Sequence, residues 1–106
     1  MKIIIDECLP KRMLQFFPND QAYTVPQIGL NGVSDSELLN ILEEKKIDVF
    51  VTIDGNIEYQ QQFHNRVFGT VIIRSPSNRY LDLLSLKEKI VDSTKNVSPG
   101  EIKHIS

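Results

Sequence analysis

The sequence predicts a three-layer α/β/α fold built on a mostly parallel sheet of four to five strands. Short apolar runs of the kind found in buried strands alternate with helical segments through the whole chain, and this order is typical of a parallel sheet with helices on both faces. Three of the runs, at residues 3–5, 48–52 and 70–73, are rich in β-branched residues, as expected for strands that are covered on both sides. Right-handed crossovers then restrict the topology to a few doubly wound arrangements.

The length and composition are those of one globular domain spanning residues 1–106. A chain of this size can form a single core without disulfide or metal staples. Hydrophobic residues make up 41% of the sequence and charged residues 25%, which excludes disorder as the default. The net charge of −2 shows no excess of basic residues that would favour nucleic acid. A nucleic-acid partner would therefore have to bind at a local basic patch or through metal ions.

The single cysteine, Cys8, cannot form an internal disulfide, and no signal peptide or long apolar stretch accompanies it. We therefore expect a cytoplasmic location and no association with a membrane. Cys8 lies beside two acids, yet the two histidines, His64 and His104, stand far from it in sequence and have no recognisable partner pattern. A free cysteine commonly behaves as a small hydrophobe, so we expect Cys8 to be a packed bystander rather than a nucleophile.

The first quarter of the chain predicts two strands around a short helix. Residues 2–5 form the opening strand. Residues 10–17 carry closely spaced apolar side chains and begin with Pro10, which favours the first position of a helix. Residues 22–25 form a brief strand, and a loop with two glycines follows it.

The middle of the chain contains the clearest helical pattern. Ser34 opens this helix, apolar residues repeat at helical spacing, and an acidic first turn gives way to lysines at the end. Residues 48–52 form the next buried strand. An Asp-Gly turn at residues 54–55 follows, and then a polar, helical piece over residues 56–64.

The last third of the chain predicts two strands and the longest helix. Residues 70–73 form a buried strand that Arg74 closes, and residues 78–94 carry apolar side chains at the spacing of a helix. After a Pro-Gly turn, residues 101–105 alternate in polarity and include Lys103, which suits an edge strand.

Carboxylates follow two of the predicted strands. If the strands at residues 2–5 and 48–52 are neighbours, their carboxyl ends bring Asp6 and Asp54 together at the edge where ligands bind in open parallel sheets. Clustered carboxylates repel one another unless a cation lies between them, and magnesium or manganese needs only a few such oxygens. Such a cation suits phosphodiester or phosphoryl transfer, because it polarises the phosphate and activates water. The candidate ligands are Asp6, Glu7, Asp35, Glu37 and Asp54.

Each acid also has a structural explanation. Asp54 can serve only the turn, and residues 34–37 fit a capping box in which Glu37 reaches back to a backbone N–H. The pattern supports a cap and a ligand equally for Glu37, whereas Asp35 is expected to be a solvated acid of the first turn. Glu7 is expected to point away from the crevice if its neighbour points into it. The metal hypothesis therefore depends on the conjunction of acids at two strand ends.

Four short motifs resemble those of a known family. The succession DECLP after the opening strand, GLNGVSDSELL at the crossover helix, VTIDGN after the next strand and GTVIIR later resembles the small PIN-like domains, a branch of the PIN-domain nuclease superfamily found as toxins of bacterial toxin–antitoxin pairs. The resemblance runs over nearly the whole chain. It implies a three-layer α/β fold, cleavage of RNA that depends on Mg²⁺ or Mn²⁺, and an antitoxin protein as partner; whether the chain forms a homo-oligomer is left open.

The resemblance also implies roles for individual residues. Carried over by motif, Asp6, Glu37 and Asp54 are the catalytic, metal-binding residues, and Glu7 belongs to the family's opening acidic pair and lies in the outer coordination sphere. Many relatives place a further acid where this chain has Asn56 and an asparagine where it has Cys8. Asn56 can still offer a carbonyl oxygen to a cation, but without charge, so metal affinity should fall and loss of nuclease activity is an alternative.

Several polar and basic residues are candidates for contacts with RNA. Some members of the family carry tyrosine-glutamine and serine-asparagine-arginine stretches like those at residues 59–61 and 77–79. Arginine offers a bidentate fork to phosphate, and amides can position the backbone or read an unpaired base. The structural alternatives are surface solubility and helix capping. The candidates are Arg12, Gln60, Arg74, Asn78 and Arg79.

The leading hypothesis from the sequence is therefore a metal-dependent endoribonuclease. A catalytically inactive PIN-like binding module is the first alternative, and Asn56 favours it. A phospho-acceptor receiver-like domain is the second, because it also places an acidic pair after the first strand and an aspartate after the third. Receiver domains need a lysine where this chain has residues 74–76, Arg-Ser-Pro, and this departure counts against them.

Overall fold

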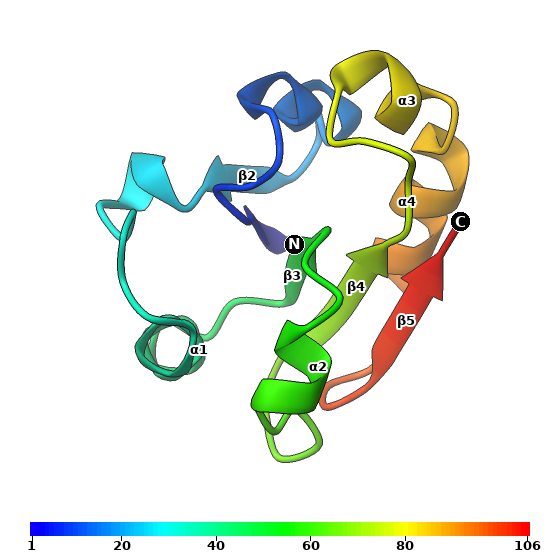
Figure 1. Cartoon of the computed structure of the whole chain (residues 1–106). Helices are drawn as coiled ribbons and strands as arrows, with labels where there is room; N and C mark the ends of the chain where they lie inside the picture. The colour runs from blue at the N-terminus through cyan, green and yellow to red at the C-terminus, as the bar shows by residue number, and fades with distance from the viewer.

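The protein, described over residues 1–106 by a computed structural model, is built on a five-stranded sheet in which every pair of neighbours is parallel (Figure 1). The strand order is β2-β1-β3-β4-β5, so the predicted α/β/α class with a parallel sheet is confirmed. The strands are β1 (Lys2–Ile5), β2 (Gln21–Thr24), β3 (Val49–Thr52), β4 (Gly69–Ile73) and β5 (Ile102–Ile105). The helices are η1 (Lys11–Phe16) and η2 (Pro26–Ile28), both of the 3-10 type, α1 (Asp35–Glu44), α2 (Ile57–Gln60), α3 (Tyr80–Leu84) and α4 (Lys87–Asn96).

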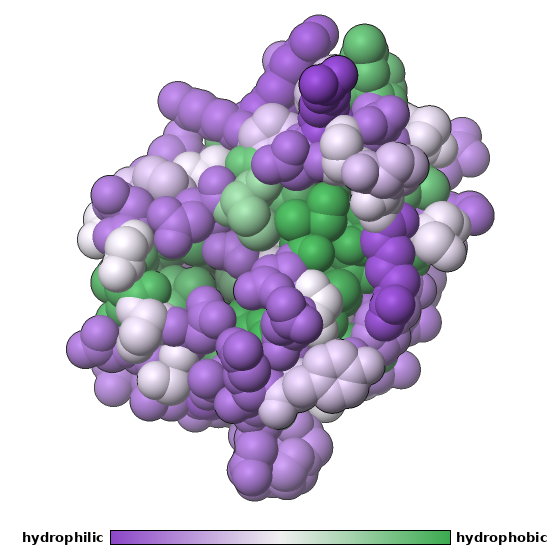
Figure 2. Space-filling view, in the orientation of Figure 1, coloured by the Kyte–Doolittle hydropathy of each residue, from purple (hydrophilic) through white to green (hydrophobic).

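Two apolar cores cover the two faces of the sheet, because successive side chains of a strand point to opposite sides. Ile3 and Ile5 face one core, which η1, α3 and α4 complete, whereas Ile4 faces the other, which α1 and α2 complete. Figure 1 shows α1 and α2 on one side of the sheet and α3 and α4 on the other. In the same view, hydrophilic side chains cover most of the visible face, and hydrophobic ones show between them near its centre (Figure 2).

The strand order changes direction at β1. The chain places β2 on one side of β1 and then adds β3, β4 and β5 in turn on the other, which leaves β5 at an edge as predicted. Ile5 pairs with Val51, so β1 and β3 end side by side. Crevices for ligands form at the carboxyl ends of such strands, where the order reverses, because the following loops diverge to opposite faces.

The segment at residues 10–17 is a 3-10 helix that begins at Lys11, so Pro10 is its N-cap rather than its first residue. Residues three apart lie on the same face of a 3-10 helix, and this geometry buries both Met13 and Phe16 in one core. The predicted helical character is therefore confirmed, and the predicted start is wrong by one residue.

The prediction of a helix over residues 56–64 is correct only for Ile57–Gln60. Gln61 is extended, with φ −129° and ψ 155°, and the chain then turns to bury Phe63. The polar glutamine run offers no apolar face that packing could stabilise, so the helix stops after one turn.

The predicted long helix over residues 78–94 is two helices, α3 and α4. Leu86 leaves helical geometry, with φ −103° and ψ 5°, and the hydroxyl of Ser85 donates a hydrogen bond to the carbonyl oxygen of Asp82 at 2.7 Å. Leu83 is fully buried, whereas Leu81 is 75% exposed. The apolar pattern therefore predicts that the segment is helical, but it does not predict which of its leucines are buried.

None of the helices is long and apolar enough to cross a membrane.

Candidate functional site

Asp6 lies directly after β1, at the point where the strand order reverses. Its backbone N–H donates to the carbonyl oxygen of Val51 at 2.9 Å, which continues the β1–β3 ladder by one residue and fixes the position of its side chain. The residue is only 9% exposed. None of the ion pairs in the molecule includes Asp6, so this buried carboxylate has no basic side chain beside it as a counter-ion.

Neutral donors hold the carboxylate of Asp6 in place. The hydroxyl of Thr52 donates to Oδ2 at 2.7 Å, and the backbone N–H of Glu7 donates to Oδ1 at 2.8 Å. Hydrogen bonds from neutral groups reduce the cost of burying a charge, but they do not neutralise it. A buried carboxylate that is oriented but uncompensated is suited to bind a cation.

Thr52 connects Asp6 to Asp54. Its hydroxyl oxygen accepts a hydrogen bond from the backbone N–H of Asp54 at 3.1 Å while it donates to Asp6. Oδ1 of Asp54 then accepts from the backbone N–H of Asn56 at 3.0 Å, in the turn that the sequence predicts. The turn uses one oxygen of Asp54 and leaves the other without a hydrogen bond, so the structural role of this acid and a ligand role are compatible.

Cys8 lies beside the hydrogen bond between Asp6 and Thr52. Its sulfur is 3.5 Å from Oδ2 of Asp6 and 3.7 Å from the hydroxyl of Thr52. The pKa of the Cys8 thiol is raised, chiefly because the thiol is buried and secondly because the charge of Asp6 lies beside it. The thiol therefore stays protonated at neutral pH, where it can donate to Asp6 but is a poor nucleophile.

Asp35, in the first turn of α1, is half-buried and close enough to the other acids for their charges to act on it. Burial raises the pKa of Asp35, and the charges of Asp54, Asp6 and Glu7 raise it further. Glu37 is exposed, and its backbone N–H donates to the hydroxyl of Ser34 at 3.4 Å, which is one half of the predicted capping box; the other half, from the backbone N–H of Ser34 to the Glu37 carboxylate, does not form. Asp35, expected to be a solvated acid of the first turn, is instead half-buried, because of the placement of α1 relative to β1 and β3.

Glu7 lies at the rim of the site. It is exposed, and its Oε1 accepts a hydrogen bond from the backbone N–H of Gly32 at 3.4 Å, which ties the loop after β1 to the loop before α1. Its charge still acts on Asp35, so it belongs to the same acidic surroundings. Asn56 is exposed, and its side chain makes no hydrogen bond.

The candidate RNA contacts are dispersed around the molecule. Arg74 is exposed directly after β4, beside the strand that leads to Asp54, and Arg79 is exposed at the N-cap of α3. Asn78 is also exposed, and its side-chain amide donates to the carbonyl oxygen of Cys8 at 2.9 Å, so it supports the loop that carries the acids. Gln60 is exposed at the end of α2, and Arg12 lies over the ring of Tyr80, 4.2 Å from its centroid.

The donor types at this edge of the sheet fit Mg²⁺ or Mn²⁺. Both ions prefer hard oxygen ligands and retain several waters, so they need only one or two carboxylates in direct contact. No three His, Cys, Asp or Glu side chains are gathered into a ready-made metal cage. The residues would therefore suit a hydrated ion held by Asp6 and Asp54, with Asp35 and Glu7 adding negative charge.

Comparisons with family models, with curated proteins and with solved structures found no match for this chain.

Proposed function

We propose that this chain is an Mg²⁺- or Mn²⁺-dependent endoribonuclease of the PIN-like type, a hydrolase of RNA phosphodiester bonds that acts as the toxin of a toxin–antitoxin pair. The observation that carries the proposal is the buried carboxylate of Asp6, which lies where the strand order reverses, has no basic counter-ion and is joined through Thr52 to Asp54. The resemblance of the sequence motifs to PIN-like domains supports the substrate class and the antitoxin partner.

The residues at the carboxyl edge of the sheet would have different roles in such an enzyme. Asp6 and Asp54 would hold the ion, and the first turn of α1 would add a third carboxylate, Glu37 by the resemblance or Asp35 by its electrostatic surroundings. A bound Mg²⁺ or Mn²⁺ would supply Lewis acidity toward the phosphate and toward the attacking water. Thr52 would keep Asp6 in a fixed orientation, so that little reorganisation is needed when the ion and the phosphate arrive.

Arg74 would position the RNA at the carboxyl edge of the sheet, together with polar and basic residues from elsewhere on the molecule. Arg74 follows β4, the strand next to β3, so its guanidinium can reach a phosphate that lies over the carboxyl ends of the strands. Gln60, Asn78 and Arg79 would contact the flanking backbone or an unpaired base. Because the chain carries a net charge of −2, bound cations would offset the acids where the phosphate arrives.

The test is a calorimetric titration of Mn²⁺ into the purified protein and into its Asp6→Asn variant. We expect the wild type to bind and the variant to lose binding, because asparagine keeps the size of Asp6 but removes its charge. Asp92→Asn, on the exposed face of α4, is the matched control and should bind as the wild type does. Unchanged binding by Asp6→Asn would remove this residue from the site.

Cleavage is tested separately on a mixture of single-stranded and structured RNAs, with Mn²⁺ and with a chelator. We expect cleavage that the chelator abolishes and that Asp6→Asn lacks. If Mn²⁺ binds but no RNA is cut, the chain is an inactive PIN-like binding module, and the neutral Asn56 in place of an acid is the feature that favours this alternative.

The strand order favours a second candidate, a phospho-acceptor receiver-like domain. The order β2-β1-β3-β4-β5 is also that of receiver domains, and Asp54 follows the third strand. However, the residue that faces Asp6 from the end of β3 is Thr52, and Asp54 lies two positions later in a turn. Incubation with acetyl phosphate decides between the two: stable phosphorylation of Asp54 supports a receiver, and its absence removes this candidate.

A further inference from the structure

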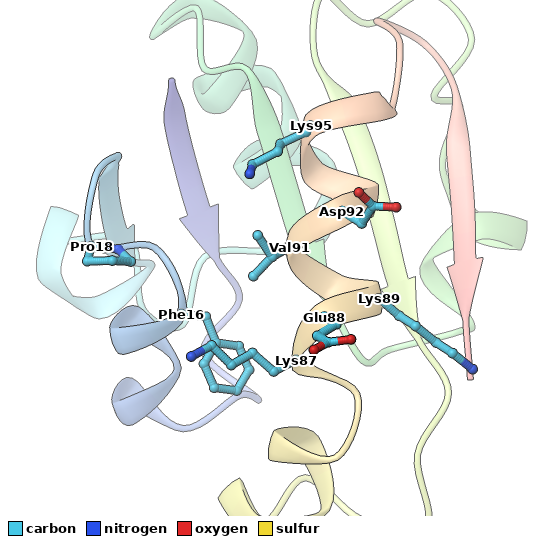
Figure 3. A pocket seen from close by; sticks show the side chains of 8 residues that line it. All are labelled: Phe16, Pro18, Lys87, Glu88, Lys89, Val91, Asp92 and Lys95. Carbon is cyan, nitrogen blue, oxygen red and sulfur yellow. The ribbon is translucent and has the colours of Figure 1, made fainter.

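The largest cavity of the molecule is a groove of about 600 Å³ between α4 and the segment that joins η1 to β2 (Figure 3). It shares no residue with the carboxylate site, so what binds there is independent of the nuclease proposal. The lining residues are Phe16, Pro18, Lys87, Glu88, Lys89, Val91, Asp92 and Lys95.

The groove has an apolar middle and basic ends. Lys87, Val91 and Lys95 are four residues apart on α4 and therefore share one face of the helix. Figure 3 shows these three side chains pointing toward Phe16 and Pro18. The lining also includes Lys89, Glu88 and Asp92, so Lys87 and Lys95 are the cations that flank the apolar middle, and two carboxylates lie farther along the helix surface.

The cations along the groove are free to meet an anionic ligand. The ammonium group of Lys87 lies 5.8 Å from the ring centroid of Phe16, and Arg12 continues the basic surface over the ring of Tyr80. None of these basic residues, nor Lys95, takes part in an ion pair with a carboxylate. On a chain with a net charge of −2, the two unpaired lysines that flank the apolar middle, Lys87 and Lys95, are complementary to a partner with two carboxylates.

We propose that this groove binds an extended, acidic polypeptide segment in which one apolar side chain has a carboxylate two residues before it and another two residues after it. Lys87 and Lys95 are separated along the helix axis by about 12 Å, from eight residues at the rise of an α-helix. Carboxylates four residues apart on an extended segment are separated by about 13 Å and point to the same side. The apolar residue between them then meets Val91, Phe16 and Pro18.

An extended peptide fits this groove better than RNA does. Unpaired bases need exposed ring faces for stacking. Here Phe16 is 3% exposed, and the ring of Tyr80 is covered by Arg12, so the groove offers apolar contact without a stacking surface.

The experiment is an NMR titration of the isotope-labelled full chain with the capped peptide Gly-Asp-Ser-Leu-Ser-Asp-Gly. We expect amide shifts confined to residues 16–18 and 87–95, and weaker binding as salt is raised, because exposed ion pairs are screened. The double variant Lys87→Glu/Lys95→Glu should weaken binding by roughly tenfold or more. Lys45→Glu, an exposed lysine at the end of α1 on the other face of the sheet, is the matched control and should stay within about twofold.

Further peptides make the proposal specific. Replacing the leucine by serine, or both aspartates by lysine, should each abolish the shifts. The spectrum of each variant reports directly whether it is folded. The proposal is overturned if the acidic peptide moves no resonance of residues 87–95 at millimolar concentration, or if Lys45→Glu weakens binding as much as the double variant does. It is also overturned if a single-stranded RNA moves the same resonances at lower concentration, since the groove would then be a nucleic-acid surface.

Discussion

Thr52 is the residue on which the geometry of the carboxylate site most directly depends. Its hydroxyl donates to the buried Asp6 and accepts from the backbone of Asp54, so it links the ends of β1 and β3. We expect Thr52→Val to lower the free energy of unfolding by about 2 kcal/mol, because a hydrogen bond to a buried charge is lost and the carboxylate keeps its desolvation cost. Urea denaturation at pH 7 measures this change.

Thr70→Val is the matched control for that substitution. Thr70 is also a fully buried threonine of the sheet, but its hydroxyl has no hydrogen-bond partner. Its removal should leave the free energy of unfolding within about 0.5 kcal/mol or raise it slightly. Equal losses for the two variants would show that the threonine shape, rather than the bond to Asp6, is what stabilises the sheet.

The titration of Asp35 should make the stability of the fold depend on pH. Its pKa is raised by burial and then by the charges of Asp54, Asp6 and Glu7, so the folded chain holds this proton more tightly than the unfolded chain does. Stability is therefore lost as pH rises through the interval above the ordinary aspartate value of 3.8. We expect Asp35→Asn to unfold at a higher temperature than the wild type at pH 7, and this difference to vanish below about pH 4.

The opposite sign for Asp35→Asn is also informative. An aspartate in the first turn of a helix is stabilised by the helix dipole, and asparagine loses this interaction. A variant less stable than the wild type at pH 7 would mean that the helix terminus, and not the neighbouring acids, dominates the energetics of this residue. Thermal unfolding of both chains between pH 3 and pH 8 distinguishes the two cases.

At the residue scale, the sequence predicts an acid of the site only where that acid follows a strand of the buried type. Asp6 and Asp54 follow buried-type strands, and the adjacency of β1 and β3 confirms that these ends lie side by side. Whether Asp35 or Glu37 faces them depends on the rotation of α1, which a capping pattern does not determine. The bond from Asn78 to Cys8 joins residues 70 positions apart, and no local pattern predicts such a contact.

At the scale of elements, strands were easier to predict than helices. A buried parallel strand is marked by its own composition, since both faces must be apolar. The ends and the phase of a short helix depend on what it packs against. This is why α2 stops after Gln60, and why the chain from α3 to α4 buries Leu83 while leaving Leu81 exposed.

The close contact between β4 and the segment after α4 predicts that Gly69 tolerates no larger side chain. A Cβ on Gly69 would lie 2.6 Å and 2.8 Å from the two methyl carbons of Val97 and 2.9 Å from the carbonyl oxygen of Ser98. We expect Gly69→Ala to destabilise the fold by about 1–3 kcal/mol, because the chain after α4 must move away from the sheet. Thermal or urea unfolding measures the change.

Gly55→Ala is the control for this close approach. A Cβ at Gly55 meets nothing within 4 Å. Its substitution should be neutral or slightly stabilising, because alanine reduces the entropy of the unfolded chain. A loss of stability at Gly55 equal to that at Gly69 would argue against packing as the cause.

At the scale of the whole molecule, the sheet order brings the carboxylates together. The reversal of the strand order at β1 places the ends of β1 and β3 side by side, and the bond between Glu7 and Gly32 ties the loop before α1 to the loop after β1. The alternation of elements predicts a doubly wound sheet, but several strand orders satisfy it. The order itself, and with it the position of the site, comes from tertiary packing.

Metal binding at the carboxylate site should therefore stabilise the entire fold. A ligand that binds only the folded chain adds about 2.7 kcal/mol at a hundred times its dissociation constant. For a domain of this size, the corresponding rise in the unfolding temperature is on the order of 10 °C. We expect saturating Mn²⁺ to produce this rise in the wild type and none in Asp6→Asn, as measured by calorimetric scans. A similar rise in Asp6→Asn would place the ion elsewhere on the surface.

The same scans decide which acid of α1 completes the site. The charges that act on Asp35 place it among the other carboxylates, whereas Glu37 is exposed. We therefore expect Asp35→Asn to reduce the Mn²⁺-induced rise strongly and Glu37→Gln to reduce it little, since an ion is held by the carboxylates that already repel one another. If Glu37→Gln has the larger effect, the motif resemblance is a better guide to the ligands than the electrostatic surroundings of Asp35 are.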